Sequence, residues 1–285
     1  MRRERVSEDI YVFTSETYAQ VTAGVIVTDE GAIVIDTLPF PFEGQEMKEF
    51  IERRCPQGVR FVINTHRHPD HVYGNYLFPE ATIMGHRLCR EGLLRDGEAI
   101  LTEGKSQTPE LAPVKLRVPD LVFDEFLGLH LGRYSLLLQH MPGHSPDVIT
   151  AFVEGEKILF AGDAITPLPY IAWGDWQDAR QSLVRAQEMT LESVVQGHGE
   201  ILLRGEIPGI LQRHIDYLEC ITDRVREIVR AGGTPDQLWS ITLEDCGESP
   251  IPLDGMVRQM HEGNLRVLYQ EFGKEAGLVQ YRLDI

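Results

Sequence analysis

The 285-residue sequence has no long apolar run, no closely spaced cysteine pair and no cluster of basic residues. A membrane-spanning helix needs about 20 consecutive apolar residues, and no run approaches that length. The first residues lack the apolar segment of a secretory signal peptide, so we expect a cytoplasmic protein. The four cysteines, Cys55, Cys89, Cys220 and Cys246, are scattered without a CxxC motif. In a reducing compartment this pattern predicts free thiols.

Positive charge is also scarce, since 27 basic residues face 44 acidic residues and the formal net charge is −17. Such a surface repels nucleic-acid phosphates and anionic lipids. We therefore expect a small-molecule substrate, and neither nucleic acid nor a membrane as a partner. A homodimer is an alternative to a monomer. The arginines at the start, Arg2, Arg3 and Arg5, are expected to form a solvated terminus rather than a binding arm.

Histidine is concentrated in one place. His66, His68 and His71, together with Asp70, fall within six residues, directly after the apolar run Phe61-Val62-Ile63. A short β-branched run that breaks into polar residues indicates a buried strand followed by a loop. Imidazole and carboxylate groups are the ligands that zinc prefers. Because only 10 of the 285 residues are histidine, this concentration predicts a metal site rather than an ordinary polar loop.

Three further apolar strands end in side chains of the same chemistry, at His144, Asp163 and His198. Each has a glycine beside it, and glycine lets the backbone pack closely around a crowded site. Asp36 ends the hairpin that precedes the histidine-rich loop, and we interpret it as a partner of the ligands rather than a simple turn cap. Strands that alternate with helices can deliver all these residues to one edge of a sheet sandwich.

The remaining pattern predicts a mixed α/β protein. Helices are expected at 43–54, 70–78 and 211–228, from Asp175, from Thr234, and at 257–272. Strands are expected at 10–13, 23–27, 32–35, 61–63, 81–84, 121–123, 127–131, 134–139, 149–153, 157–161 and 193–195. Residues 87–120 are less regular and form either a lid or substrate wall, or a plain surface excursion. Met256, Met260 and Tyr269 are expected in the core.

The order of the motifs resembles the metallo-β-lactamase superfamily over residues 10–204. These motifs are a strand ending in Asp36, HxHxDH at 66–71, Gly-His at 143–144, Gly-Asp at 162–163 and Gly-His-Gly at 197–199. The resemblance implies an α/β (α+β) fold, a four-layer αββα sandwich. It implies a catalytic domain at 1–204 and a C-terminal helical extension at 205–285.

The same resemblance implies two metal sites, occupied by two Zn²⁺ ions, with iron or manganese as alternatives. The first site would use His66, His68 and His144, and the second Asp70, His71 and His198. Asp163 would bridge both sites, and Asp36 would support the ligands from outside the two metal sites.

A metal centre of this kind implies a hydrolase that uses metal-activated water on a small carboxylic ester, thioester or lactone. Asp70 would orient the water, and Tyr170 is the candidate donor of a proton to the leaving group. The alternative for Tyr170 is a rim aromatic that shapes the pocket with Trp173. Asp163 stands where the broad-spectrum antibiotic-cleaving members often have cysteine, which counts against that branch.

Other functions stay open at this point. A mononuclear iron oxygenase similar to the persulfide dioxygenases would need only His66, His144 and Asp163. A β-lactamase-like amide hydrolase or a phosphodiesterase is a further alternative, and the acidic surface disfavours the phosphodiesterase. The helical tail resembles in position the substrate-binding tail of glyoxalase II. On it, Arg258, His261 and Lys274 are interpreted as a solvated helix face rather than a site for an acidic thiol conjugate.

Overall fold

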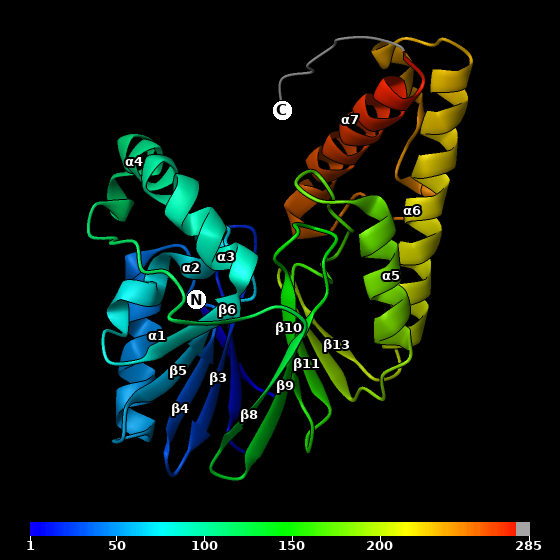
Figure 1. Ribbon diagram of the computed structural model, residues 1–285. Helices are drawn as coiled ribbons and strands as arrows, with labels where there is room; N and C mark the ends of the chain where they lie inside the picture. Colours follow the sequence, from blue (N-terminus) through cyan, green and yellow to red (C-terminus); the bar gives the residue numbers. More distant parts are fainter. Residues whose placement is uncertain (278–285) are drawn as a thin grey trace.

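The computed structural model describes residues 1–277, in which two β-sheets face each other between outer layers of helices (Figure 1). The first sheet has seven strands in the order β1-β2-β3-β4-β5-β6-β7. The second has six strands in the order β13-β12-β11-β10-β9-β8. This is the predicted αββα sandwich, so the predicted fold class is confirmed.

The strands of the first sheet are β1 Arg2–Arg5, β2 Ile10–Thr14, β3 Thr22–Thr28, β4 Gly31–Ile35, β5 Val59–Ile63, β6 Thr82–His86 and β7 Leu121–Phe123. Those of the second sheet are β8 Phe126–Leu131, β9 Tyr134–His140, β10 Ile149–Val153, β11 Ile158–Gly162, β12 Ser193–Gln196 and β13 Ile201–Leu203. The α-helices are α1 Pro41–Arg54, α2 Pro69–Val72, α3 Arg87–Gly92, α4 Glu98–Gln107, α5 Trp176–Gln187, α6 Ile207–Arg230 and α7 Val257–Glu275.

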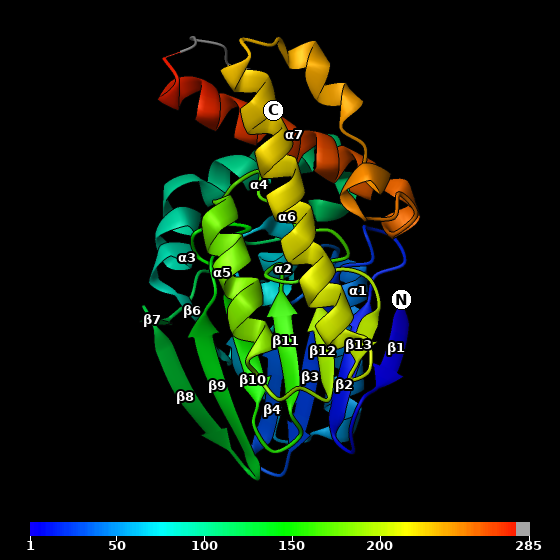
Figure 2. The ribbon, with the colours of Figure 1, turned by 90° about the vertical axis from the view of Figure 1, so that its right-hand side faces the viewer.

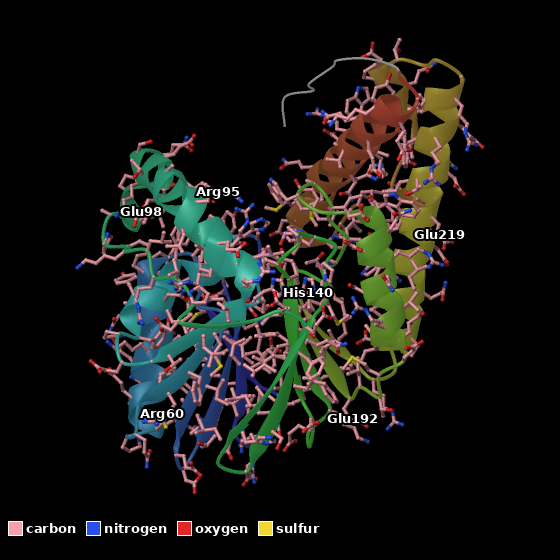
Figure 3. The ribbon with its side chains drawn as sticks, viewed as in Figure 1. Arg60, Arg95, Glu98, His140, Glu192 and Glu219 are labelled. Carbon is pink, nitrogen blue, oxygen red and sulfur yellow. A yellow bond between two sulfur atoms is a disulfide. The ribbon has the colours of Figure 1, made fainter. Side chains whose placement is uncertain are left out.

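Central strands are apolar at every position because both of their faces are buried. In β4, Ile33 and Ile35 pack between the two sheets, while Ala32 and Val34 pack toward the outer layer that contains α1. Successive side chains of a strand point to opposite faces, so one strand serves two cores. Side chains fill the space between the two sheets (Figure 3).

The second sheet is covered on its outer face by α5 and α6, as the rotated view shows (Figure 2). Apolar residues of α6 and α7 share one core with β11, β12 and α5. The C-terminal helices therefore bury part of the second sheet. The division into a catalytic domain at 1–204 and an extension at 205–285 stays a prediction.

The two sheets are joined at the edge where the predicted ligand loops begin. The Ile149 amide donates to the Thr65 carbonyl across 2.8 Å, and the Thr22 amide donates to the Gly197 carbonyl across 2.9 Å. Gly162 and Gly197 allow this close approach. A Cβ atom at Gly162 would lie 2.6 Å from the Thr65 side chain, and one at Gly197 would overlap Asp163. Loops from both sheets thus meet at a single edge.

Several local predictions were wrong. The N-terminal arginines were not expected in a strand but are part of β1, an edge strand paired with β2, although Arg3 and Arg5 are exposed as expected. The strand β13 was not predicted. The helix expected at 70–78 is the single turn α2 followed by a 3₁₀ helix at 73–77, and the helix expected from Thr234 is a 3₁₀ helix at 235–240. In short segments, tertiary contacts override the propensity that sequence patterns measure.

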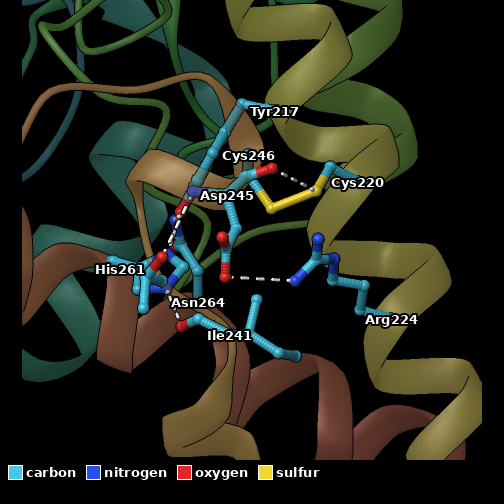
Figure 4. The surroundings of a disulfide bond; sticks show 9 residues. Tyr217, Cys220, Arg224, Ile241, Asp245, Cys246, His261 and Asn264 are labelled. Carbon is cyan, nitrogen blue, oxygen red and sulfur yellow. Dashed lines mark hydrogen bonds and ion pairs between the residues drawn. A yellow bond between two sulfur atoms is a disulfide. The ribbon is translucent and has the colours of Figure 1, made fainter.

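The prediction of four free cysteines is wrong for two of them. Cys220 of α6 and Cys246 form a disulfide, with Cα atoms 5.6 Å apart (Figure 4). Cys55 and Cys89 are free and buried, as expected. A separation of 26 residues has no local sequence signature. None of the helices in residues 1–277 combines the length and apolarity of a membrane span, and the cytoplasmic location stays a prediction.

We expect the substitution Cys220→Ser to lower the free energy of unfolding by about 3 kcal/mol, because the disulfide restricts a 26-residue loop in the unfolded chain. Urea unfolding with and without a reductant measures this loss, and the reductant should leave the Cys220→Ser variant unchanged. Thiol titration of the urea-unfolded, unreduced wild type should count two thiols. A count of four would contradict the disulfide.

Candidate metal centre

Four predicted ligands gather around one point at the joined edge of the sheets. His68 Nδ1 lies 3.0 Å from His66 Nε2 and 2.9 Å from His144 Nε2. Asp163 Oδ2 lies 3.3 Å from His144 Nε2 and 3.8 Å from His66 Nε2. The loop after β5 supplies two of the imidazoles, the loop after β9 supplies His144, and the end of β11 supplies the carboxylate.

Asp70, His71 and His198 form a second group, and its donor atoms lie within 4.8 Å of one another. Asp70 Oδ2 lies 3.7 Å from His71 Nε2 and 3.4 Å from His198 Nε2. Asp163 reaches this group as well, since its Oδ1 lies 3.3 Å from His71 Nε2 and its Oδ2 lies 3.5 Å from His198 Nε2. The structure therefore brings all seven predicted ligands together, with Asp163 between the two groups.

Hydrogen bonds at the far side of the imidazole rings fix which nitrogens face the centre. His144 Nδ1 donates to the Tyr170 carbonyl, and His198 Nδ1 donates to the Ala19 carbonyl, each across 2.8 Å. With its proton held at Nδ1, each ring presents an Nε2 lone pair to the centre. Such outer partners fix the tautomer and the orientation of metal-binding histidines.

Asp36 supports two more rings. His71 Nδ1 donates to Asp36 Oδ2 across 2.8 Å, and the Thr65 hydroxyl donates to the same oxygen across 2.7 Å. Because the single Thr65 hydroxyl proton is used there, its oxygen accepts from His66 Nδ1, 3.1 Å away. The Asp36 backbone has a φ of +57°, a conformation that aspartate adopts more readily than most residues. Asp36 thus lies where a supporting carboxylate was predicted.

The residues fit divalent cations. His71 Nε2 and Asp163 Oδ1 are buried without a hydrogen-bond partner, and converging acceptors of this kind are stabilised by a cation. Burial lowers the pKa of His66 and of His68 well below the usual value, so both rings are neutral, as metal binding requires. Burial also acts to lower the pKa of His71, but Asp70 and Asp163 outweigh it and raise that pKa. The assignment of the seven residues as ligands stays a prediction.

The two groups form the floor of a cavity of about 460 Å³. Tyr170 and Trp173 lie on its wall, with ring centroids 5.1 Å apart, and the Trp173 ring centroid lies 4.8 Å from that of His68. The Tyr170 ring packs against Gly263 of α7, where a Cβ atom would lie 3.0 Å from Cε2. This position suits both predicted roles of Tyr170, proton donor and rim aromatic.

Sequence reasoning missed several residues of the site. Thr65 directly precedes the histidine-rich motif, but its contact with Asp36 spans 29 residues and has no sequence signal. Tyr18 has no sequence signal either. It precedes two residues with positive φ, Ala19 and Gln20, in a turn whose carbonyls hold His198 and Gly199. The charge of Asp70, together with burial, raises the pKa of Tyr18 to about 12.

Two predictions for the helical tail were also wrong. Met256 is exposed at the cavity wall rather than in the core, whereas Met260 is buried and also lines the cavity. His261 is buried and not solvated. Its Nδ1 accepts a hydrogen bond from the Tyr217 hydroxyl across 2.9 Å. Arg258 and Lys274 are exposed, as expected.

The chain matches the sequence profile described as the metallo-beta-lactamase superfamily over residues 17–205. It is similar to the human acyl-coenzyme A thioesterase MBLAC2, with 28% identity over 174 residues, 55% of this chain and 60% of that protein. The match thus spans less than two thirds of that relative. It is also similar to the probable metallo-hydrolase MJ0888 of Methanocaldococcus jannaschii, with 28% identity over 54% of this chain and 77% of that protein.

Among solved structures, the metallo-beta-lactamase family protein TTHA1429 from Thermus thermophilus has the same fold. Its TM-score is 0.70 at 16% identity, and the superposition covers 97% of this chain and 96% of that one.

We expect Asp36→Asn to weaken metal affinity by about 10–100-fold, because the amide cannot accept from His71 and Thr65 as the carboxylate does. Competition with a chromophoric zinc chelator measures the affinity. Glu43→Gln, which changes a buried carboxylate on α1, serves as the control and should leave the affinity unchanged. Equal affinity in wild type and Asp36→Asn would contradict the supporting role.

Proposed function

Because the chain belongs to the metallo-beta-lactamase superfamily, we propose that it is a metal-dependent hydrolase that cleaves a small carboxylic ester, thioester or lactone with two bound zinc ions. The observation that carries the proposal is the pair of donor groups that share Asp163. A single-metal oxygenase would leave Asp70, His71 and His198 without a role. The similarity to a protein named as an acyl-coenzyme A thioesterase supports cleavage of an acyl bond.

The proposed mechanism assigns distinct tasks to the side chains. Divalent ions held by the two groups would polarise the substrate carbonyl and lower the pKa of water. Asp70, on the floor of the cavity, accepts a hydrogen bond from the attacking water and orients it. The apolar side chains of the cavity walls lower the local polarity around bound substrate, which strengthens the electrostatic interactions at the floor. Tyr170 donates a proton to the leaving oxygen or sulfur.

The choice of small substrates agrees with the enclosure of the site. Five of the predicted ligands line the cavity: His68, Asp70, His144, Asp163 and His198. A volume of about 460 Å³ lies within the range of small-molecule sites. The formal net charge of −17 repels the sugar-phosphate backbone of a nucleic acid, so a phosphodiesterase or nuclease remains disfavoured.

The zinc-reconstituted protein should hydrolyse at least one member of a panel of thioesters, esters and lactones, and it should contain about two zinc ions per chain. His68→Ala should lower kcat/KM by more than about 100-fold, since loss of even an outer partner typically costs 10–100-fold. The exposed His130 on β8 supplies the control variant His130→Ala. Full activity of His68→Ala, or one iron per chain with oxygen uptake, would contradict the proposal.

Esters with different leaving groups distinguish the two predicted roles of Tyr170, proton donor and rim aromatic. Tyr170→Phe should slow hydrolysis of an alkyl ester by about 100-fold, the lower end for general acid catalysis. It should hardly affect the p-nitrophenyl ester of the same acid, whose leaving group needs no proton. Equal losses with both esters would make Tyr170 a rim aromatic. A selective loss in Tyr18→Phe instead would assign the proton to Tyr18.

A further inference from the structure

Two helices from distant parts of the chain form facing walls above the metal centre. On α4, Ile100, Glu103, Gly104 and Gln107 lie on one face, at the spacing of neighbouring helix turns, and line the cavity. The opposite wall comes from Leu253 and Met256, which precede α7, and from Met260 in its first turn. α4 and α7 stand on opposite sides of the same end of the sandwich (Figure 1).

These walls are apolar and partly uncovered. Ile100 is 43% exposed, Met256 36% and Trp173 50%, and all three line the cavity. Grouped apolar side chains at a cleft indicate a binding surface, whereas single exposed ones are ordinary. Methionine side chains adapt their shape to flexible apolar ligands. The walls therefore match an aliphatic chain that extends away from the metal centre.

The charge of the cavity limits what else it can hold. Among the described residues, neither lysine nor arginine lines it, and Glu103 adds a carboxylate above the floor. The guanidinium of Arg67 belongs to an adjoining cavity, where its Nη1 is already paired with Asp96 at 3.1 Å. Arg258 and Lys274 are exposed and lie outside the lining. A phosphate or carboxylate on the leaving group would meet the Glu103 carboxylate, and neither a lysine nor an arginine of the lining would pair with it.

We propose that the substrate is an uncharged ester, thioester or lactone with a medium-length aliphatic acyl chain, and that a phosphate-bearing thiol such as coenzyme A is excluded as leaving group. The proposal rests on the proposed hydrolase function. The acyl chain lies between Ile100 of α4 and Met256, with its carbonyl at the donor groups on the floor. Glu103 repels anionic leaving groups.

The acyl-chain part is tested with the zinc-loaded protein and neutral esters of acetic, butanoic, hexanoic and octanoic acid. We expect kcat/KM to rise about fourfold per methylene group, the factor that corresponds to burial of one methylene. Ile100→Asp should remove the rise, so that the acetyl and octanoyl esters are hydrolysed with similar kcat/KM. Leu94→Asp adds the same charge at an exposed position outside the cavity and should change neither value. Equal kcat/KM of the wild type for all four esters would contradict the proposed binding of an aliphatic acyl chain.

The leaving-group part is tested with two thioesters that share the octanoyl group. Wild type should prefer the uncharged S-octanoyl-N-acetylcysteamine over octanoyl-coenzyme A by at least about tenfold in kcat/KM. Glu103→Lys, which places a cation on the same wall, should reduce that preference by about tenfold. Equal or better use of the coenzyme A ester by wild type would overturn the exclusion while leaving the hydrolase function intact.

A binding measurement separates failure of this proposal from failure of the hydrolase function. Calorimetric titration uses 2-octanone and 2-butanone, uncharged ketones that have no bond to hydrolyse. We expect at least about tenfold tighter binding of 2-octanone, and loss of this difference in Ile100→Asp but not in Leu94→Asp. If this binding pattern appears while no ester or thioester is cleaved, the aliphatic binding site is supported and the hydrolase function is contradicted. If the two ketones bind equally, the aliphatic site fails.

Discussion

The site depends on hydrogen bonds that hold ring protons away from its centre. His71 donates directly to Asp36, His66 reaches the same carboxylate through the Thr65 hydroxyl, and His144 and His198 donate to backbone carbonyls. With these partners in place, lone pairs and carboxylate oxygens converge on two adjacent points. Acceptor atoms that converge in a buried site are unfavourable without a cation. The hydrogen bonds that hold these atoms in place therefore favour binding of a metal ion.

This arrangement requires two sheets to be locked at one edge. Parallel pairing of β4, β5 and β6 brings Asp36 and the histidine-rich loop to the same end of the first sheet. Parallel pairing of β11 and β12 does the same for Asp163 and His198 in the second. The backbone hydrogen bond from Ile149 to Thr65 then joins the two ends. Close approach at Gly162 and Gly197 leaves no room for larger residues.

Catalytic floor and substrate walls come from different parts of the chain. The floor uses loops at strand ends, where rigid elements on both sides fix the side chains. The walls use α4 and the segment leading into α7, which lie outside the sheets. The metal chemistry and the choice of substrate can therefore change independently of each other. In this chain the walls are apolar and uncharged except for Glu103, and the proposed neutral aliphatic substrate rests on this composition.

The sequence by itself indicated the strands of the sandwich other than β1 and β13, and it indicated the candidate metal ligands. Apolar runs mark strands that are buried on both faces. The histidines and aspartates follow the ends of these strands, so their pattern can be recognised from the sequence. Only the tertiary structure decided the link through Thr65, the pairing of Cys220 with Cys246, the buried position of His261 and the place of Met256 at the cavity wall. These features join segments far apart in the chain, or depend on which face of a helix is covered. Local sequence patterns report periodicity and propensity, and they carry no information about which distant segment supplies the partner.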